Sequence, residues 1–205
     1  MHPLTVARAA VREHGALQKE GELAGLVSLL ADVAPQVVVE VGCDAGGTLW
    51  AWRQLNPRRL LGVELPGAGY SSGKPLVDHG AEVVYADSHD PKTVEVLRDL
   101  LGSDEVDFLF IDGDHTYEGC RRDFELYSPL VRPDGVIAFH DVCHHPGQPD
   151  VGVDILWRQL GGAKDEIVTD PPTWGGIGVL RQPSGWDELR GYLHGRIEEL
   201  AGVRT

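Results

Sequence analysis

A rhythm repeated through the middle of the chain constrains its fold more than any other feature. Short apolar runs alternate with a turn and a helical stretch, and they lie at residues 37–42, 59–65, 81–87, 106–113 and 135–142. This order is typical of parallel strands joined by crossover helices. Because the runs are nearly continuous in apolar residues, we expect strands that are buried on both faces. The sequence therefore predicts an α/β fold with a doubly wound, mostly parallel sheet.

Helix signals lie in the segments between these runs. Asp90 and Pro91 supply an N-cap and a first-turn proline for a helix that Gly102 would close. We also expect a leading helix over 15–33, ahead of the first run, and a further helix over 151–160. Helices between consecutive runs are the connections that parallel strands require.

The pattern changes toward the C-terminal end of the sequence. Two apolar runs, in 166–170 and 175–182, are joined without a helix, so we expect an antiparallel hairpin at one edge of the sheet. A C-terminal helix is predicted over 186–201, with an apolar stripe that suits packing on its own domain. Since the sequence contains no linker or repeat, residues 1–205 are expected to form a single domain with its core in 36–182.

Composition and charge exclude several classes of partner. The chain is 42% hydrophobic and carries a net charge of -14, and a field of that sign repels the phosphate backbone of nucleic acids. The sequence has neither the run of roughly 18 apolar residues that a membrane helix needs nor an apolar signal-peptide core at its start. The 3 cysteines lack CxxC spacing, which suits reduced thiols. We therefore expect a soluble, cytoplasmic protein without a nucleic-acid or membrane partner, and homo-oligomerisation is left open.

A glycine-rich turn follows the first apolar run and leads into a helix. Its residues include Glu40, Gly42, Asp44 and Gly46. Glycines at such a turn let the backbone bend sharply and let a nucleotide-like ligand approach without a Cβ in the way. Glu64 ends the second run, where a carboxylate accepts hydrogen bonds from both ribose hydroxyls. Together these features predict a nucleotide cofactor in the crevice of a Rossmann-like sheet.

The spacing within the turn distinguishes two kinds of nucleotide-binding enzyme. Nicotinamide-dependent dehydrogenases carry GxGxxG, which this turn lacks. The acidic residue two positions before the first glycine resembles motif I of class I S-adenosylmethionine (SAM)-dependent methyltransferases, with Asp44 where their middle glycine usually lies. The resemblance implies SAM as the cofactor, with contacts from Glu40, Gly42, Asp44, Gly46 and Glu64. A turn with only a structural role is the alternative.

The third run ends in Asp87, Ser88 and His89. In the methyltransferases that the chain resembles, residues at this strand end lie near the adenine ring, which implies that Asp87 and Ser88 bind the cofactor. The alternative is that Asp87 and Ser88 only start the next loop and cap the helix after Pro91.

A longer resemblance narrows the family. The segments FIDGDHTYEG and AFHDV, with LQKEGEL near the start and WGGIGVL near the end, closely resemble a branch of small methyltransferases. This branch includes macrolide-sugar O-methyltransferases and proteins described as cephalosporin hydroxylases. The likeness runs over most of residues 15–182. It implies O-methylation of a small-molecule hydroxyl, assisted in some relatives by a divalent metal such as Mg²⁺.

Two carboxylates are expected to face one pocket, because Asp112 and Asp141 end neighbouring strands. At that spacing they would repel each other unless a cation or a proton lay between them, and oxygen ligands suit Mg²⁺. The metal-binding relatives imply Asp112, His140 and Asp141 as ligands, with Asp112 also beside the cofactor. Those relatives usually have an acidic residue in place of His140, and an imidazole shifts the preference toward Mn²⁺, Fe²⁺ or Zn²⁺. His140 and Asp141 can both bind only if the strand has ended, because adjacent strand residues point to opposite faces.

Two alternatives to this metal site stay open. In the first, Asp112 and Asp141 accept hydrogen bonds from loop amides or orient the substrate directly. In the second, the loop that carries Cys143, His144 and His145 joins His140 in binding zinc, although these residues lack paired ligand spacing.

Methyl transfer to a hydroxyl requires an aligned acceptor and a group that takes its proton. His115 lies in the loop after Asp112 and is the predicted general base, so these two residues form the predicted catalytic pair. Tyr117, Trp174 and the glycines at 175 and 176 are candidates for the wall of the acceptor pocket, and packing is the alternative role for each.

Three functions follow from these patterns. The first is a small-molecule O-methyltransferase, the second an NAD(P)-dependent oxidoreductase on a similar sheet, and the third a non-catalytic nucleotide-binding domain that binds a partner protein. The acceptor is left open among sugar hydroxyls, phenols and polyketide or peptide natural products, because specificity lies in loops that no motif here encodes.

Overall fold

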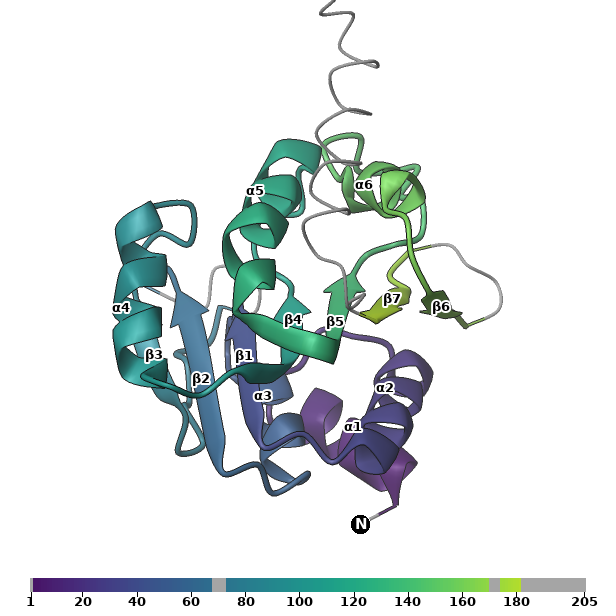
Figure 1. The fold of residues 1–205 in the computed structure, drawn as a ribbon. Helices are drawn as coiled ribbons and strands as arrows, with labels where there is room; N and C mark the ends of the chain where they lie inside the picture. Colours follow the sequence, from purple (N-terminus) through teal and green to yellow (C-terminus); the bar gives the residue numbers. More distant parts are fainter. Residues whose placement is uncertain (1, 68–72, 170–173, 182–205) are drawn as a thin grey trace, which may run out of the picture.

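A computed structural model describes residues 2–67, 73–169 and 174–181. This part of the chain contains a seven-stranded sheet in the order β3-β2-β1-β4-β5-β7-β6 (Figure 1). The strands from β3 to β5 are parallel, whereas β7 runs antiparallel to both β5 and β6. The strands are β1 Val37–Val41, β2 Arg59–Glu64, β3 Glu82–Tyr85, β4 Val106–Ile111, β5 Val131–His140, β6 Lys164–Ile167 and β7 Ile177–Arg181. The predicted mostly parallel, Rossmann-like sheet with an antiparallel edge hairpin is confirmed.

Helices cover both faces of the sheet (Figure 1). One layer consists of α1 Pro3–Glu13, α2 Glu20–Val33 and α3 Gly47–Arg53, and the other of α4 Pro91–Leu101, α5 Tyr117–Tyr127 and α6 Val153–Gln159. A short 3₁₀ helix, Ser128–Leu130, follows α5. Strand β1 is buried along its whole length because Val38 packs under the first layer and Val39 under the second. Burial on both faces explains why the strand sequences are continuously apolar.

The leading helix predicted over 15–33 is wrong at its start. Helix α2 begins at Glu20, and the separate helix α1 precedes it. Gly15 adopts φ +87°, and a Cβ on Gly47 would lie only 2.1 Å from Ala16 N. The chain therefore passes close against the glycine turn as a non-helical segment before α2 starts. This path brings residues 15–18 to the carboxyl ends of the strands.

Other predicted elements can be compared directly. Helix α4 follows Asp90, whose side chain accepts a hydrogen bond from Lys92 N, and it ends before Gly102, as predicted. Helix α6 lies within the predicted range 151–160. The C-terminal helix predicted over 186–201 lies outside the described residues. Within the described ranges, no helix has the length and apolar character needed to span a membrane.

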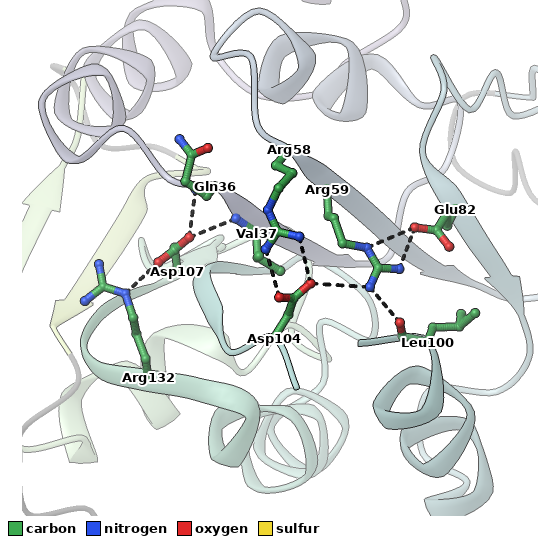
Figure 2. Close-up of polar contacts among 9 residues, drawn as sticks. All are labelled: Gln36, Val37, Arg58, Arg59, Glu82, Leu100, Asp104, Asp107 and Arg132. Atoms are coloured by element: carbon green, nitrogen blue, oxygen red, sulfur yellow. Dashed lines mark hydrogen bonds and ion pairs between the residues drawn. The ribbon is translucent and has the colours of Figure 1, made fainter. Parts of the chain in front are cut away.

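A network of charged residues fixes the amino ends of the strands (Figure 2). Asp107 Oδ2 accepts hydrogen bonds from the N–H groups of Gln36 (2.7 Å) and Val37 (2.8 Å), and Oδ1 accepts one from Arg132 Nε (2.5 Å). A second carboxylate, Asp104, pairs with arginines at the start of β2. The other residues drawn in this network are Arg58, Arg59, Glu82 and Leu100. These contacts satisfy backbone groups at one end of the sheet, and the opposite, carboxyl ends are where ligands bind in such folds.

Candidate active site

The glycine turn follows β1 and packs against the carboxyl end of β4. Gly42 adopts φ +84°, and a Cβ there would lie 2.3 Å from Asp112 O. Both the backbone conformation and the lack of space therefore require glycine. Asp44 adopts φ +43°, a left-handed conformation that aspartate tolerates better than most residues. This tolerance explains how Asp44 can stand where the resemblance predicts a glycine.

Glu64, at the end of β2, holds the turn in place. Its Oε2 accepts hydrogen bonds from the N–H groups of Cys43 (2.6 Å) and Asp44 (2.7 Å), and its Oε1 accepts one from Leu65 N (2.7 Å). A carboxylate oxygen has two acceptor positions, so Oε2 is filled while Oε1 keeps one for a ligand hydroxyl. The geometry is compatible with the predicted ribose contact and adds a structural role that the sequence did not reveal.

Glu40 and Gly46 lie behind the turn and line neither of the two cavities described below. Glu40 is fully buried, and its carboxylate accepts hydrogen bonds from the Thr48 hydroxyl and from Trp52 Nε1. Burial is the main cause that raises the pKa of Glu40 well above its usual range. A Cβ on Gly46 would lie 2.0 Å from Val77 O. Both residues shape the turn, and the cofactor contacts predicted for them find no support in this geometry.

A cavity of about 390 Å³ opens at the ends of β1 to β4. It brings together most of the residues predicted to bind the cofactor, namely Gly42, Asp44, Glu64, Asp87, Ser88 and Asp112. Asp87 Oδ1 accepts a hydrogen bond from His89 N (2.9 Å), whereas Asp90 caps α4. Asp87 and Ser88 therefore stand on the cavity wall and leave the capping role to another residue.

A second cavity, of about 440 Å³, shares Gly42, Asp44, Asp112 and His115 with the first. Its polar wall also includes Gln18, His140, Asp141 and His145, and its apolar wall includes Leu17, Val151 and Trp174. Tyr117 is not a lining residue, because its hydroxyl donates a hydrogen bond to Gln159 Oε1 (2.8 Å). Of the aromatic residues predicted for the acceptor pocket, only Trp174 lies on its wall.

His140 and Asp141, at the end of β5, lie beside Asp112, at the end of β4. The strand ends at His140, and Asp141 adopts φ +64°. This left-handed residue interrupts the alternation of side chains, so both residues can face the same site. His140 Nδ1 lies 3.1 Å from Asp112 Oδ1 and 3.5 Å from Asp141 Oδ1. Because the strand has ended before Asp141, His140 and Asp141 can both face one metal ion.

Three residues here could hold a divalent cation, and His115 takes the place that the sequence predicts for Asp141. Asp112, His115 and His140 each offer a ligand atom, and the three atoms lie within 4.8 Å of one another. Among the described residues, neither Asp112 Oδ1 nor Asp141 Oδ1 receives a hydrogen bond, although both atoms are buried. Buried carboxylate oxygens cost free energy unless a proton or a cation compensates them. Neither Cys143 nor His144 belongs to this group, so the zinc alternative in that loop gains no support.

The chain matches one known protein family. A family model described as a methyltransferase domain matches residues 39–142, which include the glycine turn, Glu64 and both carboxylates. The chain belongs to this methyltransferase family. The predicted resemblance to class I SAM-dependent methyltransferases is thereby confirmed.

Two curated relatives match parts of this chain. The uncharacterized protein R132 of Acanthamoeba polyphaga mimivirus is 32% identical over 122 residues, which cover 55% of the chain and 54% of that protein. The uncharacterized protein y4gI of Sinorhizobium fredii is 30% identical over 89 residues, which cover 43% of the chain and 9% of that protein. The matches therefore span about half of one curated relative and a small part of the other.

Solved structures share the methyltransferase fold at low sequence identity. MycE from the mycinamycin biosynthetic pathway, in complex with Mg, SAH and mycinamycin VI, has a TM-score of 0.65 and 14% identity, covering 89% of this chain and 55% of its own. The O-methyltransferase from Bacillus cereus in complex with SAH has a TM-score of 0.58 and 20% identity, covering 88% and 89%. TomG from Streptomyces achromogenes, in complex with SAM, has a TM-score of 0.58 and 22% identity, covering 89% and 90%.

Electrostatics set the protonation of the histidines and carboxylates in this site. His115 Nδ1 lies 2.6 Å from Asp141 Oδ2, and Nε2 lies 3.7 Å from Asp112 Oδ1. Burial lowers the pKa of His115, but the hydrogen bond to Asp141 and the charges of both carboxylates outweigh burial and raise the pKa to about 9. Burial raises the pKa of Asp141, but His115 and His140 outweigh it and lower the pKa to about 2. The imidazole of His115 is therefore a cation at neutral pH when no metal is bound.

Two further residues lie in the site: Gln18, which no prediction included, and His145, which the sequence offered only as a zinc ligand. Gln18 Nε2 donates a hydrogen bond to Asp112 Oδ2 (2.7 Å). His145 Nε2 lies 3.1 Å from Asp141 Oδ1 and accepts a hydrogen bond from Gly175 N (3.0 Å). The LQKEGEL segment was the sequence signal for Gln18, but only the path of residues 15–18 past the glycine turn places its side chain.

Proposed function

We propose that this methyltransferase uses SAM to methylate a hydroxyl group of a small molecule. The observation that carries the proposal is the wall that the two cavities share, formed by Gly42, Asp44, Asp112 and His115. A methyl donor in one cavity and an acceptor in the other would meet at this wall, as an in-line transfer requires. The Bacillus cereus O-methyltransferase and TomG, solved with SAH and SAM respectively, support the choice of cofactor and acceptor atom.

The 390 Å³ cavity is the proposed SAM site. When bound, SAM supplies an activated methyl group on its sulfonium. Glu64 Oε1 would accept a ribose hydroxyl with its remaining acceptor position, and Asp87 and Ser88 would lie beside the adenine ring. Gly42 would let the backbone approach the cofactor closely, because any side chain there would strike Asp112 O.

A divalent cation held by Asp112, His140 and Asp141 is part of the proposal. The two buried carboxylate oxygens that receive no hydrogen bond from the described residues support it. When bound, such a cation would lower the pKa of the acceptor hydroxyl and fix its direction. Gln18 occupies Asp112 Oδ2, which keeps Asp112 Oδ1 turned toward His140. The imidazole of His140 favours Mn²⁺, Fe²⁺ or Zn²⁺, whereas MycE was solved with Mg.

The walls of the 440 Å³ cavity indicate the class of acceptor. Among the described residues that line it there is no lysine or arginine, and the imidazolium of His115 is already paired with Asp141, so an anionic group such as a phosphate would find no unpaired cation among them. Leu17 and Trp174 are 47% and 42% exposed on its wall, and such apolar surfaces take apolar or aromatic scaffolds. We therefore propose a neutral acceptor with a hydroxyl on an apolar scaffold. Tailoring of a natural product in the cytoplasm is the proposed setting, and the pathway of MycE supports it.

Binding and turnover assays test this function. Calorimetry is expected to give micromolar binding of SAM and no binding of NADH. Catechol, a neutral phenol, is expected to be methylated with Mg²⁺ or Mn²⁺ present, while catechol monophosphate is not. Binding of NADH without SAM would support the oxidoreductase instead. Binding of SAM without methylation of catechol or any other neutral hydroxyl tested would support the non-catalytic domain.

A further inference from the structure

The buried carboxylate of Glu22 lies outside the proposed catalytic group. It connects helix α2 to Thr169, just after β6, and to Gly176, just before β7. Glu22 is fully buried in the first turns of α2. Its Oε1 accepts hydrogen bonds from Thr169 N (3.0 Å) and Thr169 Oγ1 (2.9 Å), and its Oε2 accepts one from Gly176 N (2.8 Å). One side chain thus holds two segments that lie about 150 residues away in the sequence.

Lys19 extends this contact to the acceptor wall. Its Nζ lies 3.3 Å from Glu22 Oε1, donates a hydrogen bond to Trp174 O (2.5 Å) and lies 4.7 Å from the centre of the Trp174 ring. The ammonium group therefore binds Trp174 both through the backbone and through the ring face. Trp174 lines the 440 Å³ cavity, so the pair formed by Lys19 and Glu22 fixes one wall of the proposed acceptor site.

The same segment reaches the proposed metal ligands. Gly175 N donates a hydrogen bond to His145 Nε2 (3.0 Å), and this nitrogen lies 3.1 Å from Asp141 Oδ1. Because Nε2 accepts the Gly175 hydrogen, it carries no proton and cannot donate to Asp141. Asp141 Oδ1 is accordingly one of the buried oxygens that receive no hydrogen bond from the described residues. The position of Gly175 thus decides whether His145 satisfies Asp141.

Positions 175 and 176 require glycine because of their backbone conformation and because the neighbouring side chains leave little space for a Cβ. Gly175 and Gly176 adopt φ +73° and +80°. A Cβ on Gly175 would lie 3.0 Å from Glu22 Oε2, and one on Gly176 would lie 2.6 Å from Cys143 Sγ. Burying a carboxylate costs free energy that an apolar residue would not, so the contacts of Glu22 are better explained by placement of this segment than by stability.

We propose that Glu22 is a positioning residue for the acceptor side of the site. It holds Gly175 and Gly176 so that Trp174 forms the acceptor wall and His145 keeps its proton on Nδ1. Asp141 Oδ1 then stays available to a ligand. The proposal rests on the proposed function for the role of the cavity, but the state of His145 can be measured without any acceptor.

The test compares Glu22→Gln with Asp107→Asn. Asp107 is a matched control, because it also accepts two backbone hydrogen bonds and pairs with a basic side chain, but at the opposite end of the sheet (Figure 2). The tautomer of His145 is followed by ¹⁵N-resolved NMR of the histidine rings. A His145→Gln variant assigns the signal. Calorimetry gives the Kd of SAM, and methylation of catechol gives its KM.

In the parent protein and in Asp107→Asn, His145 is expected to show a single Nδ1–H tautomer. In Glu22→Gln, the amide oxygen is expected to stay with Thr169 and Lys19, which are the more numerous donors, so the amide nitrogen faces Gly176 N and cannot accept its hydrogen. A mixture with the Nε2–H tautomer is then expected. The KM for catechol should rise about fivefold or more, the worth of one hydrogen bond, with the Kd of SAM unchanged. A pure Nδ1–H tautomer in folded Glu22→Gln would overturn the proposal.

A second variant covers the case in which Glu22→Gln does not fold. Glu22→Asp keeps the charge beside Lys19 but withdraws the carboxylate from Gly176 by one methylene, and it should give the same mixture of tautomers. A folded Glu22→Asp protein with a pure Nδ1–H tautomer would also overturn the proposal. If the parent methylates catechol monophosphate but not catechol, the proposed acceptor class is contradicted, while the tautomer of His145 still decides the role of Glu22.

Discussion

His115 Nδ1 lies 2.6 Å from Asp141 Oδ2, so the imidazole predicted to act as a base is held as the positive partner of an ion pair. The sequence predicts a histidine that titrates near neutrality, but the two neighbouring carboxylates overcome the effect of burial and raise the pKa of His115 to about 9. A general base must be unprotonated when it acts. His115 can therefore serve as one in the metal-free protein only at alkaline pH.

This ion pair makes the stability of the metal-free protein depend on pH. His115 has a pKa of about 9 in the folded protein and an ordinary value of 6.5, so its contribution is complete below 6.5 and is lost as pH rises through 9. Asp141 has a pKa of about 2 and an ordinary value of 3.8, so its contribution is present above 3.8 and is lost as pH falls through 2. The difference in Tm between the parent and His115→Gln should be largest between these windows and should shrink toward pH 9. A difference that stays constant from pH 5 to 9 would contradict the assigned pKa of His115.

Replacement of His115 tests its role as the base. His115→Ala is expected to bind SAM like the parent and to lose on the order of 10² to 10⁴ in turnover of catechol, the usual worth of one positioned acid-base group. The residual turnover of the metal-free parent should rise with pH toward about 9, since the proton on His115 must leave first. The competing role, a loop contact, predicts a lower Tm with the turnover per folded molecule preserved. Near-parental turnover of folded His115→Ala at saturating catechol would remove His115 from the mechanism.

Glu64 should influence the cofactor in two ways. Loss of its carboxylate removes the proposed ribose hydrogen bond to Oε1 and also the acceptor that holds the N–H groups of Cys43 and Asp44. Glu64→Ala is therefore expected to weaken SAM binding by roughly 1 to 3 kcal/mol, measured by calorimetry. Asp107→Asn, at the other end of the sheet, should leave SAM binding unchanged. SAM binding as tight as in the parent would show that the ribose assignment is wrong.

Two glycine variants distinguish the close contact between the glycine turn and β4 from the effect of backbone strain alone. Gly42 and Gly102 both have positive φ, +84° and +62°, but a Cβ on Gly42 would lie 2.3 Å from Asp112 O, whereas nothing lies within 4 Å of one on Gly102. Gly102→Ala should cost about 1 to 3 kcal/mol of unfolding free energy from strain alone. Gly42→Ala should cost clearly more in urea unfolding and should also abolish SAM binding, because Asp112 must move. Equal losses of unfolding free energy in the two variants would mean that Asp112 can move away from a Cβ at residue 42 at little cost.

Individual residues show what the sequence could predict and what it could not. The continuous apolar runs predicted the parallel strands, because burial on both faces leaves that signature in each strand separately. The predicted leading helix started too early, because the contact between Gly47 and Ala16 arises only when distant segments pack together. The sequence also offered Asp112, His140 and Asp141 as one group, but the positive φ of Asp141 that lets them share a site is a property of the folded chain. The pKa of His115 depends on charges from two strand ends, which periodicity does not encode.

Turnover is expected to depend on the proposed metal. Chelator-treated protein is expected to lose turnover of catechol while keeping its Kd for SAM, because the cation would contact the acceptor hydroxyl and not the cofactor. Re-addition of Mn²⁺ should restore turnover at lower concentration than Mg²⁺, since His140 contributes an imidazole to the site. Metal affinity itself, measured by calorimetry with Mn²⁺ alone, should fall in both Asp112→Asn and Asp141→Asn.

The two carboxylate variants also distinguish the metal from the alternative role. If Asp112 and Asp141 bind a cation together, either substitution removes a charge from the same site, and both should lose turnover to a similar extent. If they instead hold the acceptor directly, each amide still hydrogen-bonds, so the losses should be smaller and should appear mainly in the KM for catechol. Full turnover in metal-free protein would reject the cation. The two buried oxygens that receive no hydrogen bond from the described residues would then be left to bind the acceptor hydroxyl itself.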